Sequence, residues 1–357
     1  MDGSVEELAK RRPTRKVMVG NIPIGGDAPV SIQSMTNTPT CDIEATVAQI
    51  KALEDAGCDI VRVAVPDMAS AEAVRSIKEQ ISIPLVADIH FDHQLALKAM
   101  ENGADKIRIN PGNIGSKDRV REVVSMASQK GIPIRVGVNS GSLEKLLLDK
   151  YGRVCAEALV ESAINHAAIL EDLGFRDIVI SIKSSDVVMS YKAYHLLSQK
   201  TDYPLHIGIT EAGTPYRGTI KSAVGIGALL LNGIGDTLRV SLTGDPVEEV
   251  RAAKEILRAC GLYSKGIQFI SCPTCGRTQI DLIRIASEVE QALEGMDKPI
   301  KVAIMGCVVN GPGEAREADI GIAGGKRSAV LFKKGQIIKK VDEDKIVETL
   351  VQAIKEL

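Results

Sequence analysis

An alternation of short apolar runs with longer amphipathic segments constrains the fold of this chain most. Between residues 30 and 261, runs rich in Val and Ile begin after Pro or Asp, and amphipathic segments that end at Gly follow them. This pattern predicts a repeated strand–helix unit. The predicted strands cover residues 30–36, 60–66, 84–90, 106–112, 133–139, 177–184, 204–211 and 237–243.

The helical segments between these strands show the expected periodicity. In residues 43–56, Val47, Ile50 and Leu53 recur at helical spacing, and Gly57 follows as a stop signal. Near-continuous apolar strands, each followed by a helix, predict a closed (β/α)8 TIM barrel, an α/β fold, over residues 1–262. A doubly wound open sheet is the main alternative. It is disfavoured because no G-x-G-x-x-G motif follows any of the first strands.

The regular alternation of strand and helix patterns does not continue in residues 263–357. An apolar run leads into the Cys-Pro-Thr-Cys-Gly turn at residues 272–276, and a helical pattern follows over residues 279–294. Further apolar runs, a predicted hairpin and a helical pattern from residue 342 complete this part of the chain. The segment is therefore predicted to be a second, smaller α+β domain.

The composition of the 357 residues limits the class of partner. The formal net charge is -2, aromatic residues make up 3% and Trp is absent, so the basic surface and stacking platforms of nucleic-acid-binding proteins are not expected. There is no apolar run long enough for a membrane span, and no apolar run follows the charged N-terminus. A cytoplasmic protein is predicted. In a reducing compartment, a Cys-x-x-Cys pair binds metal or does redox work more often than it forms a disulfide.

Cations lie inside five of the predicted barrel strands, where apolar residues are expected. They are Arg62, Arg108, Arg135, Lys183 and Arg239. A charge that is buried without a partner is costly, and only Asp88 and Glu211 offer carboxylates near these strand ends. The excess of cations predicts an anion that binds from outside. Because Arg matches phosphate oxygens in its bidentate fork, a diphosphate at the carboxyl ends of the strands is the favoured ligand.

Other polar side chains follow the same strand ends and are predicted to orient a substrate. They are Asp88, His90, Asn110, Asn139, His206 and Ser241. Glu211, the last residue of its predicted strand, is the candidate general acid, because a partly desolvated carboxylate in a barrel mouth is suited to deliver a proton. A structural salt bridge is the alternative for Glu211, and core packing is the alternative for the two histidines.

The cysteines of the C-terminal segment form a candidate metal site. Cys272 and Cys275 have ligand spacing, and Cys307 follows a later strand, so the three thiolates suit either structural zinc or an iron–sulfur cluster. Every histidine precedes Cys272, whereas Glu314 lies in a Gly-rich turn after Cys307. An exchangeable oxygen ligand favours a catalytic [4Fe–4S] cluster. Cys260 as a fourth thiolate keeps the zinc alternative open.

The chain contains the motifs VRVAVP, KIRINPGNIG, HIGITEAG, CPTCGR and GCVVNGPGEA. Together these motifs resemble the 4-hydroxy-3-methylbut-2-enyl diphosphate synthase (GcpE/IspG) family in its compact two-domain bacterial form. The resemblance implies a TIM barrel followed by an iron–sulfur domain related to a domain of sulfite reductases. It also implies an oxidoreductase that opens 2-C-methyl-D-erythritol 2,4-cyclodiphosphate reductively to (E)-4-hydroxy-3-methylbut-2-enyl diphosphate. That reaction belongs to the non-mevalonate (MEP) route to isoprenoids and terpenoids.

The resemblance also implies roles for individual residues and partners. The cluster ligands would be Cys272, Cys275, Cys307 and Glu314, and the diphosphate would be held by Arg62, Arg108, Arg135, Lys183 and Ser241, with Asn139 in the same pocket. Glu211 would be the proton donor. A homodimer in which the cluster domain of one subunit closes over the barrel of the other is implied, with flavodoxin or ferredoxin as the electron donor. Separate substrate and cluster domains predict a hinge near residues 261–266.

Two other functions fit parts of the sequence. One is a non-redox pterin or phosphosugar enzyme whose C-terminal domain holds structural zinc. The other is a non-catalytic electron carrier, for which the barrel cations would be irrelevant to redox activity.

Overall fold

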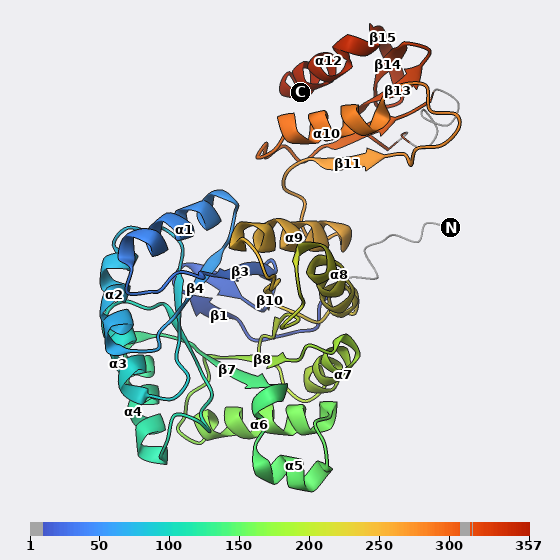
Figure 1. The fold of residues 1–357 in the computed structure, drawn as a ribbon. Coiled ribbons are helices and arrows are strands. Elements are labelled where there is room, and N and C mark those ends of the chain that lie inside the picture. The colour runs from blue at the N-terminus through green and yellow to red at the C-terminus, as the bar shows by residue number, and fades with distance from the viewer. Residues whose placement is uncertain (1–9, 308–314, 316) are drawn as a thin grey trace. The chain divides into compact units, whose positions relative to one another are not determined.

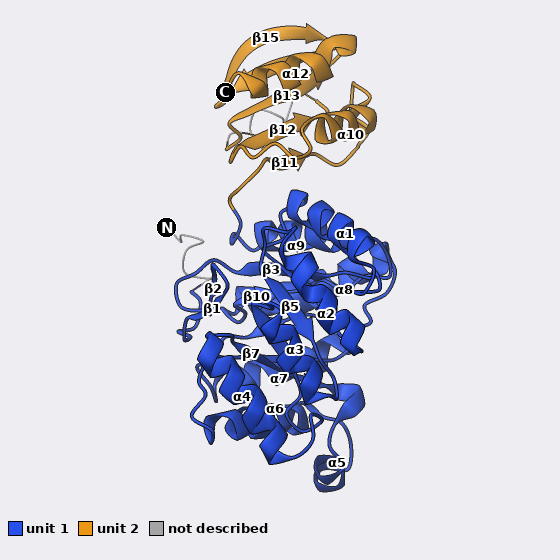
Figure 2. Ribbon diagram, turned by 90° about the vertical axis from the view of Figure 1, so that its left-hand side faces the viewer, with its two compact units in different colours: residues 1–263 blue, residues 264–357 orange. Residues whose placement is uncertain are grey.

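The chain folds into two compact units. The computed structural model describes residues 10–307, 315 and 317–357, and the units are residues 1–263 and 264–357 (Figure 2). Each unit has its own cluster of buried apolar side chains. The two units are therefore described separately.

The first unit is a parallel barrel, as predicted. Its strands are β3 (Ser31–Met35), β4 (Ile60–Ala64), β5 (Leu85–Asp88), β6 (Lys106–Ile109), β7 (Ile134–Asn139), β8 (Ile178–Lys183), β9 (His206–Ile207) and β10 (Thr237–Leu238). They form an eight-stranded sheet in the order β8-β7-β6-β5-β4-β3-β10-β9. A parallel bridge between Ile180 and Leu205 brings the two ends of the sheet together. Because the sheet closes on itself, the carboxyl ends of all its strands meet at one mouth.

Helices surround the strands of this unit (Figure 1). They are α1 (Ile43–Asp55), α2 (Met68–Lys78), α3 (His93–Glu101), α4 (Lys117–Lys130), α5 (Lys145–Tyr151), α6 (Ala156–Glu171), α7 (Val187–Ser198), α8 (Pro215–Leu231) and α9 (Pro246–Ala259). An Asp carboxylate accepts a backbone N–H in the first turn of several of them, as Asp42 does for α1 and Asp67 for α2. This capping ends each strand–helix loop at a defined residue. Gly131, with φ 64°, closes α4 in the left-handed conformation that a side chain disfavours.

An N-terminal hairpin precedes the barrel and was not predicted. Strands β1 (Val17–Val19) and β2 (Ile22–Ile24) pair antiparallel. Buried Val19 and Ile24 pack against Ile60 and Val86 near the starts of β4 and β5. The hairpin therefore covers the amino end of the barrel. Strands of three residues are too short to give a periodic signal, which explains why the sequence pattern missed them.

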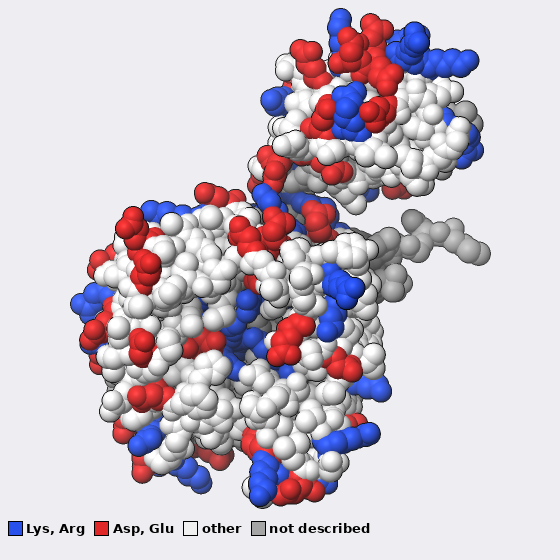
Figure 3. Space-filling model, viewed as in Figure 1, with Lys and Arg blue, Asp and Glu red and all other residues white. Residues whose placement is uncertain are grey.

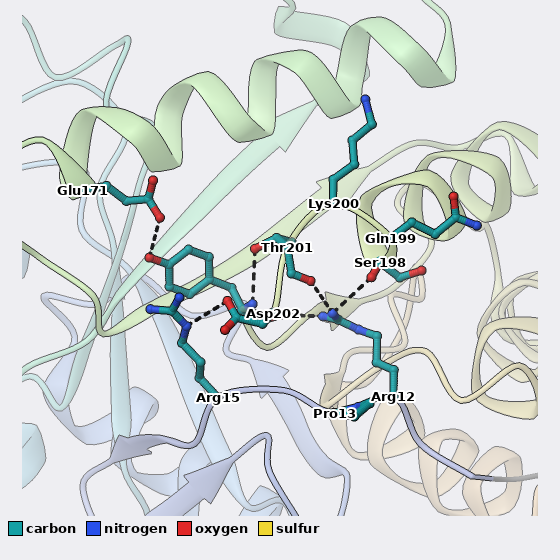
Figure 4. Close-up of a pocket in the computed structure, with 10 residues that line it drawn as sticks. Arg12, Pro13, Arg15, Glu171, Ser198, Gln199, Lys200, Thr201 and Asp202 are labelled. Atoms are coloured by element: carbon teal, nitrogen blue, oxygen red, sulfur yellow. Dashed lines mark hydrogen bonds and ion pairs between the residues drawn. The ribbon is translucent and has the colours of Figure 1, made fainter.

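A surface pocket lies beside the segment that leads into this hairpin (Figure 4). The Arg12 guanidinium donates hydrogen bonds to the backbone carbonyls of Thr201 and Tyr203, and Arg15 Nε lies 2.8 Å from Asp202 Oδ1. These partners directly precede β9, so the pocket lies at the amino ends of the strands. Its arginines anchor the N-terminal segment. Because barrel chemistry takes place at the carboxyl ends, we assign this pocket a structural role.

Two predicted strands are shorter in the structure than in the sequence pattern. The predicted strand 204–211 is reduced to β9, and 237–243 is reduced to β10. Gly208 follows β9, and a Cβ atom there would lie 2.6 Å from the carbonyl oxygen of Arg239. Gly208 therefore lets the segment after β9 approach the backbone of Arg239 more closely than a residue with a side chain would allow. Glu211, Arg239 and Ser241 consequently lie in loops at the mouth rather than within strands.

The second unit is an α+β domain with one mixed sheet. Its elements are β11 (Gln268–Ser271), α10 (Leu282–Ala292), β12 (Lys301–Met305), β13 (Ile320–Gly325), β14 (Ser328–Lys333), β15 (Gln336–Asp342) and α12 (Ile346–Lys355). The sheet order is β11-β12-β13-β14-β15, with β11, β12 and β13 parallel. Helices α10 and α12 contribute apolar side chains to the core of this unit. None of the helices that the structure describes is long and apolar enough to cross a membrane.

Candidate active site

Lysine and arginine side chains gather in a hollow in the middle of one face of the barrel unit (Figure 3). Arg62 on β4 and Arg108 on β6 are both 3% exposed, and they flank Asp88 on β5. Arg108 Nη1 lies 3.2 Å from Asp88 Oδ1, and Arg62 Nε lies 3.8 Å from Asp88 Oδ2. One carboxylate therefore serves two buried guanidinium groups.

Burial and the neighbouring charges shift the pKa values of Arg62 and Asp88 in opposite directions. Burial lowers the pKa of Arg62 to about 10, although Asp88 raises it. Burial alone would raise the pKa of Asp88, but Arg62, the hydrogen bond from His90 and Arg108 together hold it well below its usual range. Asp88 is therefore ionised at neutral pH.

Arg135 on β7 is buried with few hydrogen bonds to offset the loss of contact with water. It is the register partner of Arg108, and its one hydrogen bond in the structure runs from Nη1 to Ser181 Oγ at 3.4 Å. Its Nε and Nη2 atoms are buried and have no hydrogen-bond partner in the part of the chain that the structure describes. Burial, followed by the nearby charges of Arg62 and Arg108, lowers its pKa well below the usual value. An unsatisfied guanidinium in a mouth is suited to receive phosphate oxygens.

Lys183 ends β8 beside the end of β7. It is the register partner of Asn139, so this ammonium group and an amide extend from neighbouring strand ends. Burial and the charges of Arg62, Arg135 and Arg239 lower the pKa of Lys183 well below its usual value. The structure thus brings Arg62, Arg108, Arg135 and Lys183 to one group within the barrel, and Arg239 is close enough for its charge to act on Arg62 and Lys183.

Arg239 differs because it has an acid partner that sequence analysis missed. Its Nη2 atom lies 3.3 Å from Glu249 Oε1, and Glu249 is 4% exposed on α9. Glu249 also accepts hydrogen bonds from Ser34 Oγ at 2.9 Å and from the Leu242 backbone N–H at 3.0 Å. The expectation that only Asp88 and Glu211 offer carboxylates near the cations was therefore incomplete: Asp88 does pair with Arg62 and Arg108, but Arg239 pairs with Glu249. Glu249 occupies an ordinary helical position, so its inward direction has no distinct sequence signal.

Lys106 is a further interior cation that the sequence analysis did not single out. It lies two residues before Arg108 on β6, so both side chains point to the same side of the sheet. Lys106 is 0% exposed, and its Nζ atom has no hydrogen-bond partner. A lysine at the start of a strand commonly lies at the surface, which is why the pattern gave it no weight.

The other predicted polar residues take different positions around this group. His90 is exposed, with Nε2 3.5 Å from Asp88 Oδ2. Asn110 is 7% exposed and its Oδ1 accepts the Gly112 backbone N–H at 3.1 Å, so this side chain shapes the β6–α4 loop. His206 is 1% exposed, deep in the barrel, where burial and the charges of Arg135 and Lys106 lower its pKa well below the usual value. Ser241 is partly buried beyond the end of β10.

Glu211 is more exposed to solvent than predicted. It lies in the loop after β9 and is exposed, so the partial desolvation expected of a strand-end carboxylate is absent here. Its φ of 51° is in the left-handed region, which is unfavourable for a residue with a side chain. Such strain persists where the surrounding structure imposes it, and it is concentrated at functional sites.

The three cysteines of the second unit follow the ends of two neighbouring parallel strands. Cys272 follows β11 and Cys307 follows β12 after Gly306, and the pairing of Ser271 with Ile304 sets these ends side by side. The Gly306 backbone N–H donates a hydrogen bond to Cys272 Sγ at 3.1 Å. The Gln279 backbone N–H donates to the Gly306 carbonyl at 3.0 Å, which ties the Cys272–Cys275 turn to the β12 end. The backbone therefore holds all three cysteines at one edge of the sheet.

Electrostatics favour the thiolate form of one of them. Hydrogen bonds from the backbone and then the side chain of Arg277 lower the pKa of Cys275, which is exposed. Metal ligation requires thiolates, so this donor set fits a thiophilic metal group. Within the described residues, no three His, Cys, Asp or Glu side chains already converge closely enough to hold an ion. The predicted ligand Glu314 lies outside the described residues.

Cys260 does not share this setting. It caps α9 in the barrel unit, is 9% exposed and packs against Gly227, with Sγ 4.0 Å from the Gly227 carbonyl oxygen. Burial raises its pKa, which disfavours a thiolate ligand. The basis for the four-sulfur zinc alternative is therefore weakened.

A barrel with a cationic mouth, joined to a domain with three grouped cysteines, defines a two-domain α/β protein with the parts of a redox enzyme for a phosphorylated substrate. Residues 14–254 match the GcpE TIM-barrel domain, and residues 268–356 match the GcpE protein C-terminal domain. The chain belongs to the GcpE family.

Curated relatives share most of their length with this chain. The 4-hydroxy-3-methylbut-2-en-1-yl diphosphate synthase (flavodoxin) of Clostridium perfringens is 66% identical over 97% of this chain and 99% of its own length. The enzyme of the same name from Ruminiclostridium cellulolyticum is 61% identical over 99% of this chain and 100% of its own, and that from Geobacter sulfurreducens is 61% identical over 96% and 98%.

Solved structures with the same barrel fold are more distant. Dihydropteroate synthase from Yersinia pestis is 12% identical, with a TM-score of 0.50, over 69% of this chain and 98% of its own. The Stenotrophomonas maltophilia enzyme is 14% identical, with a TM-score of 0.51, over 70% and 98%. At this level of identity the likeness is one of fold alone, so it lends no support to a pterin substrate.

Proposed function

We propose that this protein is an iron–sulfur oxidoreductase of the MEP pathway. It opens 2-C-methyl-D-erythritol 2,4-cyclodiphosphate by two-electron reduction and loss of water, forming (E)-4-hydroxy-3-methylbut-2-enyl diphosphate. The name shared by relatives that match nearly the whole chain supports this reaction. The observation that carries the proposal is the pairing of Arg108 with Arg135 in a barrel mouth where Arg135 keeps unsatisfied donors.

The barrel, residues 1–262, is the proposed substrate domain. Its guanidinium and ammonium groups bind the diphosphate, with Ser241 and Asn139 at the rim, and they stabilise the negative charge that develops on the diphosphate as the ring C–O bond breaks. The residues assigned to substrate binding are Arg62, Asp88, His90, Arg108, Asn110, Arg135, Asn139, Lys183, His206, Arg239 and Ser241. Within this set Asp88 also holds the guanidinium groups of Arg62 and Arg108 in place, and Glu249, which is not part of the set, holds that of Arg239.

Glu211 is the proposed proton donor for the departing hydroxyl group. Its place in the loop after β9, where the backbone is held at positive φ, supports this role. Closure of the site around the substrate would remove Glu211 from water, and a desolvated carboxyl group holds its proton more readily.

The C-terminal segment, residues 263–357, is the proposed cluster domain. Enzymes of the GcpE family carry a [4Fe–4S] cluster. Cys272, Cys275 and Cys307 would hold it, with Glu314 as the proposed fourth and exchangeable ligand. When bound, the cluster supplies the electrons at an iron that a substrate oxygen can approach. The backbone N–H groups around Cys272 and Cys275 stabilise thiolate charge in the ligand set.

The proposed sites lie in different units, so turnover requires the units to meet. A hinge near residues 261–266 would allow this closure. We also propose a homodimer, and an exposed apolar stripe on α8 supports it: Tyr216, Ile220 and Val224 follow each other at four-residue spacing and are 79%, 50% and 59% exposed. The free thiols of the described chain are consistent with a reducing cytoplasm, and flavodoxin or ferredoxin is the proposed electron donor.

Anaerobic purification followed by an assay tests this function. We expect a brown protein that contains iron and sulfide and that converts the cyclic diphosphate when an artificial reductant is added. A colourless protein with one zinc ion per chain and no turnover would instead support the non-redox alternative. A protein that transfers electrons equally well after Arg108→Ala would support the electron-carrier alternative.

A further inference from the structure

Lys106 lies beneath the proposed diphosphate pocket, and none of the described acidic side chains forms an ion pair with it. It precedes Arg108 by two residues on β6, so its Cα lies roughly 7 Å deeper along the same inward-facing side of the strand. The residue is fully buried and its Nζ atom lacks a hydrogen-bond partner. Leaving an ammonium group in that state is costly, and an apolar side chain would avoid the cost.

The surroundings of Lys106 are polar and also incompletely satisfied. Its neighbour His206 on β9 has no hydrogen-bond partner at Nε2 among the described residues. The positive charges of Arg135 and Arg62 act on Lys106. The same two charges, together with that of Lys183, act on His206. The titratable and charged groups facing this part of the barrel are Arg62, Asp88, Arg108, Arg135, Lys183, Tyr194, His206 and Arg239.

The balance of these charges changes when an anion arrives. Before binding, an additional positive charge at Lys106 is opposed by burial and by Arg135 and Arg62, which lower its pKa well below the usual value. A diphosphate bound above Arg108 and Arg135 would neutralise that repulsion and add an attraction from the other side. The same ammonium group would then be stabilised.

We propose that Lys106 is a positioning residue for the diphosphate: it is a neutral amine before the anion binds, takes up one proton from solvent on binding, and then attracts the anion from beneath. This inference rests on the proposed function, because it requires the barrel to bind a diphosphate. The proton comes from water and no covalent bond to the substrate forms. Lys106 acts through the electrostatic potential of the pocket and does not touch the reacting carbon atoms.

Calorimetric titration with inorganic diphosphate tests the proposal without turnover. The full-length protein with its cluster is titrated anaerobically near neutral pH in two buffers of different ionisation enthalpy, which gives the number of protons taken up. The variant is Lys106→Met, with Lys106→Gln as a second neutral variant should the first fail to fold. Lys130→Met on the exposed end of α4 is the control for loss of one lysine. His206→Asn distinguishes uptake by the imidazole from uptake by the lysine.

We expect the unmodified protein to take up about one proton more than Lys106→Met and to bind inorganic diphosphate about tenfold more tightly. Lys130→Met and His206→Asn should retain the extra proton. The ligand-free Lys106→Met variant should unfold at a temperature no lower than that of the unmodified protein, because an unpartnered buried amine has been removed.

Equal proton uptake and equal affinity in Lys106→Met would overturn the proposal, as would loss of the extra proton in His206→Asn alone. If the unmodified protein binds no inorganic diphosphate, the proposed function of the barrel fails as well, and that result is distinct from the others.

Discussion

Arg108 and Arg135 are register partners on neighbouring parallel strands, so two buried guanidinium groups start side by side inside the barrel. Asp88 contacts the first of them at 3.2 Å, whereas the second keeps two unsatisfied nitrogen atoms. A folded protein tolerates this arrangement at a cost in stability. A phosphorylated ligand offsets this cost when its oxygen atoms accept hydrogen bonds from the unsatisfied nitrogen atoms.

Asp88 should be a main determinant of stability in the barrel. Asp88→Asn leaves Arg62 and Arg108 without their shared carboxylate, and we expect it to lower the free energy of unfolding by about 3 kcal/mol in urea denaturation at neutral pH. Because the folded-state pKa of Asp88 is depressed, its stabilisation is present above the unfolded pKa of about 4 and is lost as pH falls through the folded pKa. The difference between the two proteins should therefore shrink in acid. A constant difference between neutral pH and strongly acidic pH would contradict this assignment.

Turnover should depend on the carboxyl group of Glu211, whereas the stability of the protein should not depend on the Glu211 side chain. Glu211→Gly relieves the positive φ, so the free energy of unfolding should stay within about 1 kcal/mol of the original or rise, while turnover falls about 100-fold. Glu211→Gln keeps the side-chain shape and should lose turnover to a similar extent. Thermal unfolding and anaerobic turnover are measured together. Full activity in either variant would remove Glu211 from the mechanism.

Cysteine reactivity should follow the local electrostatics in the iron-free protein. Cys275 has a lowered pKa and is exposed, so iodoacetamide should alkylate it at lower pH than an ordinary thiol. Cys58 should resist, because burial raises its pKa to about 12. Peptide mass spectrometry across a pH series measures both rates. Arg277→Ala removes the side-chain donor but keeps the backbone N–H, so it should move the Cys275 profile part of the way to higher pH. An unchanged profile would show that the Arg277 side chain does not stabilise the thiolate.

The apolar stripe on α8 should carry the dimer. Ile220→Asp places a charge in the middle of the stripe and should convert the protein to monomers, as measured by light scattering after size-exclusion chromatography. Leu146→Asp is the matched control, because Leu146 on α5 is 82% exposed and lies outside the stripe. Dimers that persist in Ile220→Asp, or are lost equally in Leu146→Asp, would place the interface elsewhere.

Strand and helix periodicity was sufficient to predict the barrel, because each apolar run was bounded by turn residues and each helix by a capping Asp or a Gly. The same reasoning found Arg62, Arg108 and Arg135, since a cation within an apolar run stands out. Glu249 and Lys106 were missed because their burial depends on which side of an element faces inward in three dimensions. The close approach of Gly208 to Arg239 was missed as well, because a contact between distant residues leaves no local pattern.

Turnover of the cyclic diphosphate by Arg135→Met tests the role of the barrel cations most directly. The variant removes the least satisfied guanidinium of the mouth and leaves the cysteines untouched. With iron and sulfide content equal to that of the unmodified protein, kcat/KM measured anaerobically should fall at least about 100-fold, on the order of 3 kcal/mol of transition-state stabilisation. An Arg135→Met protein that keeps its cluster and turns over the cyclic diphosphate at the original rate would contradict a barrel mouth built to hold the diphosphate.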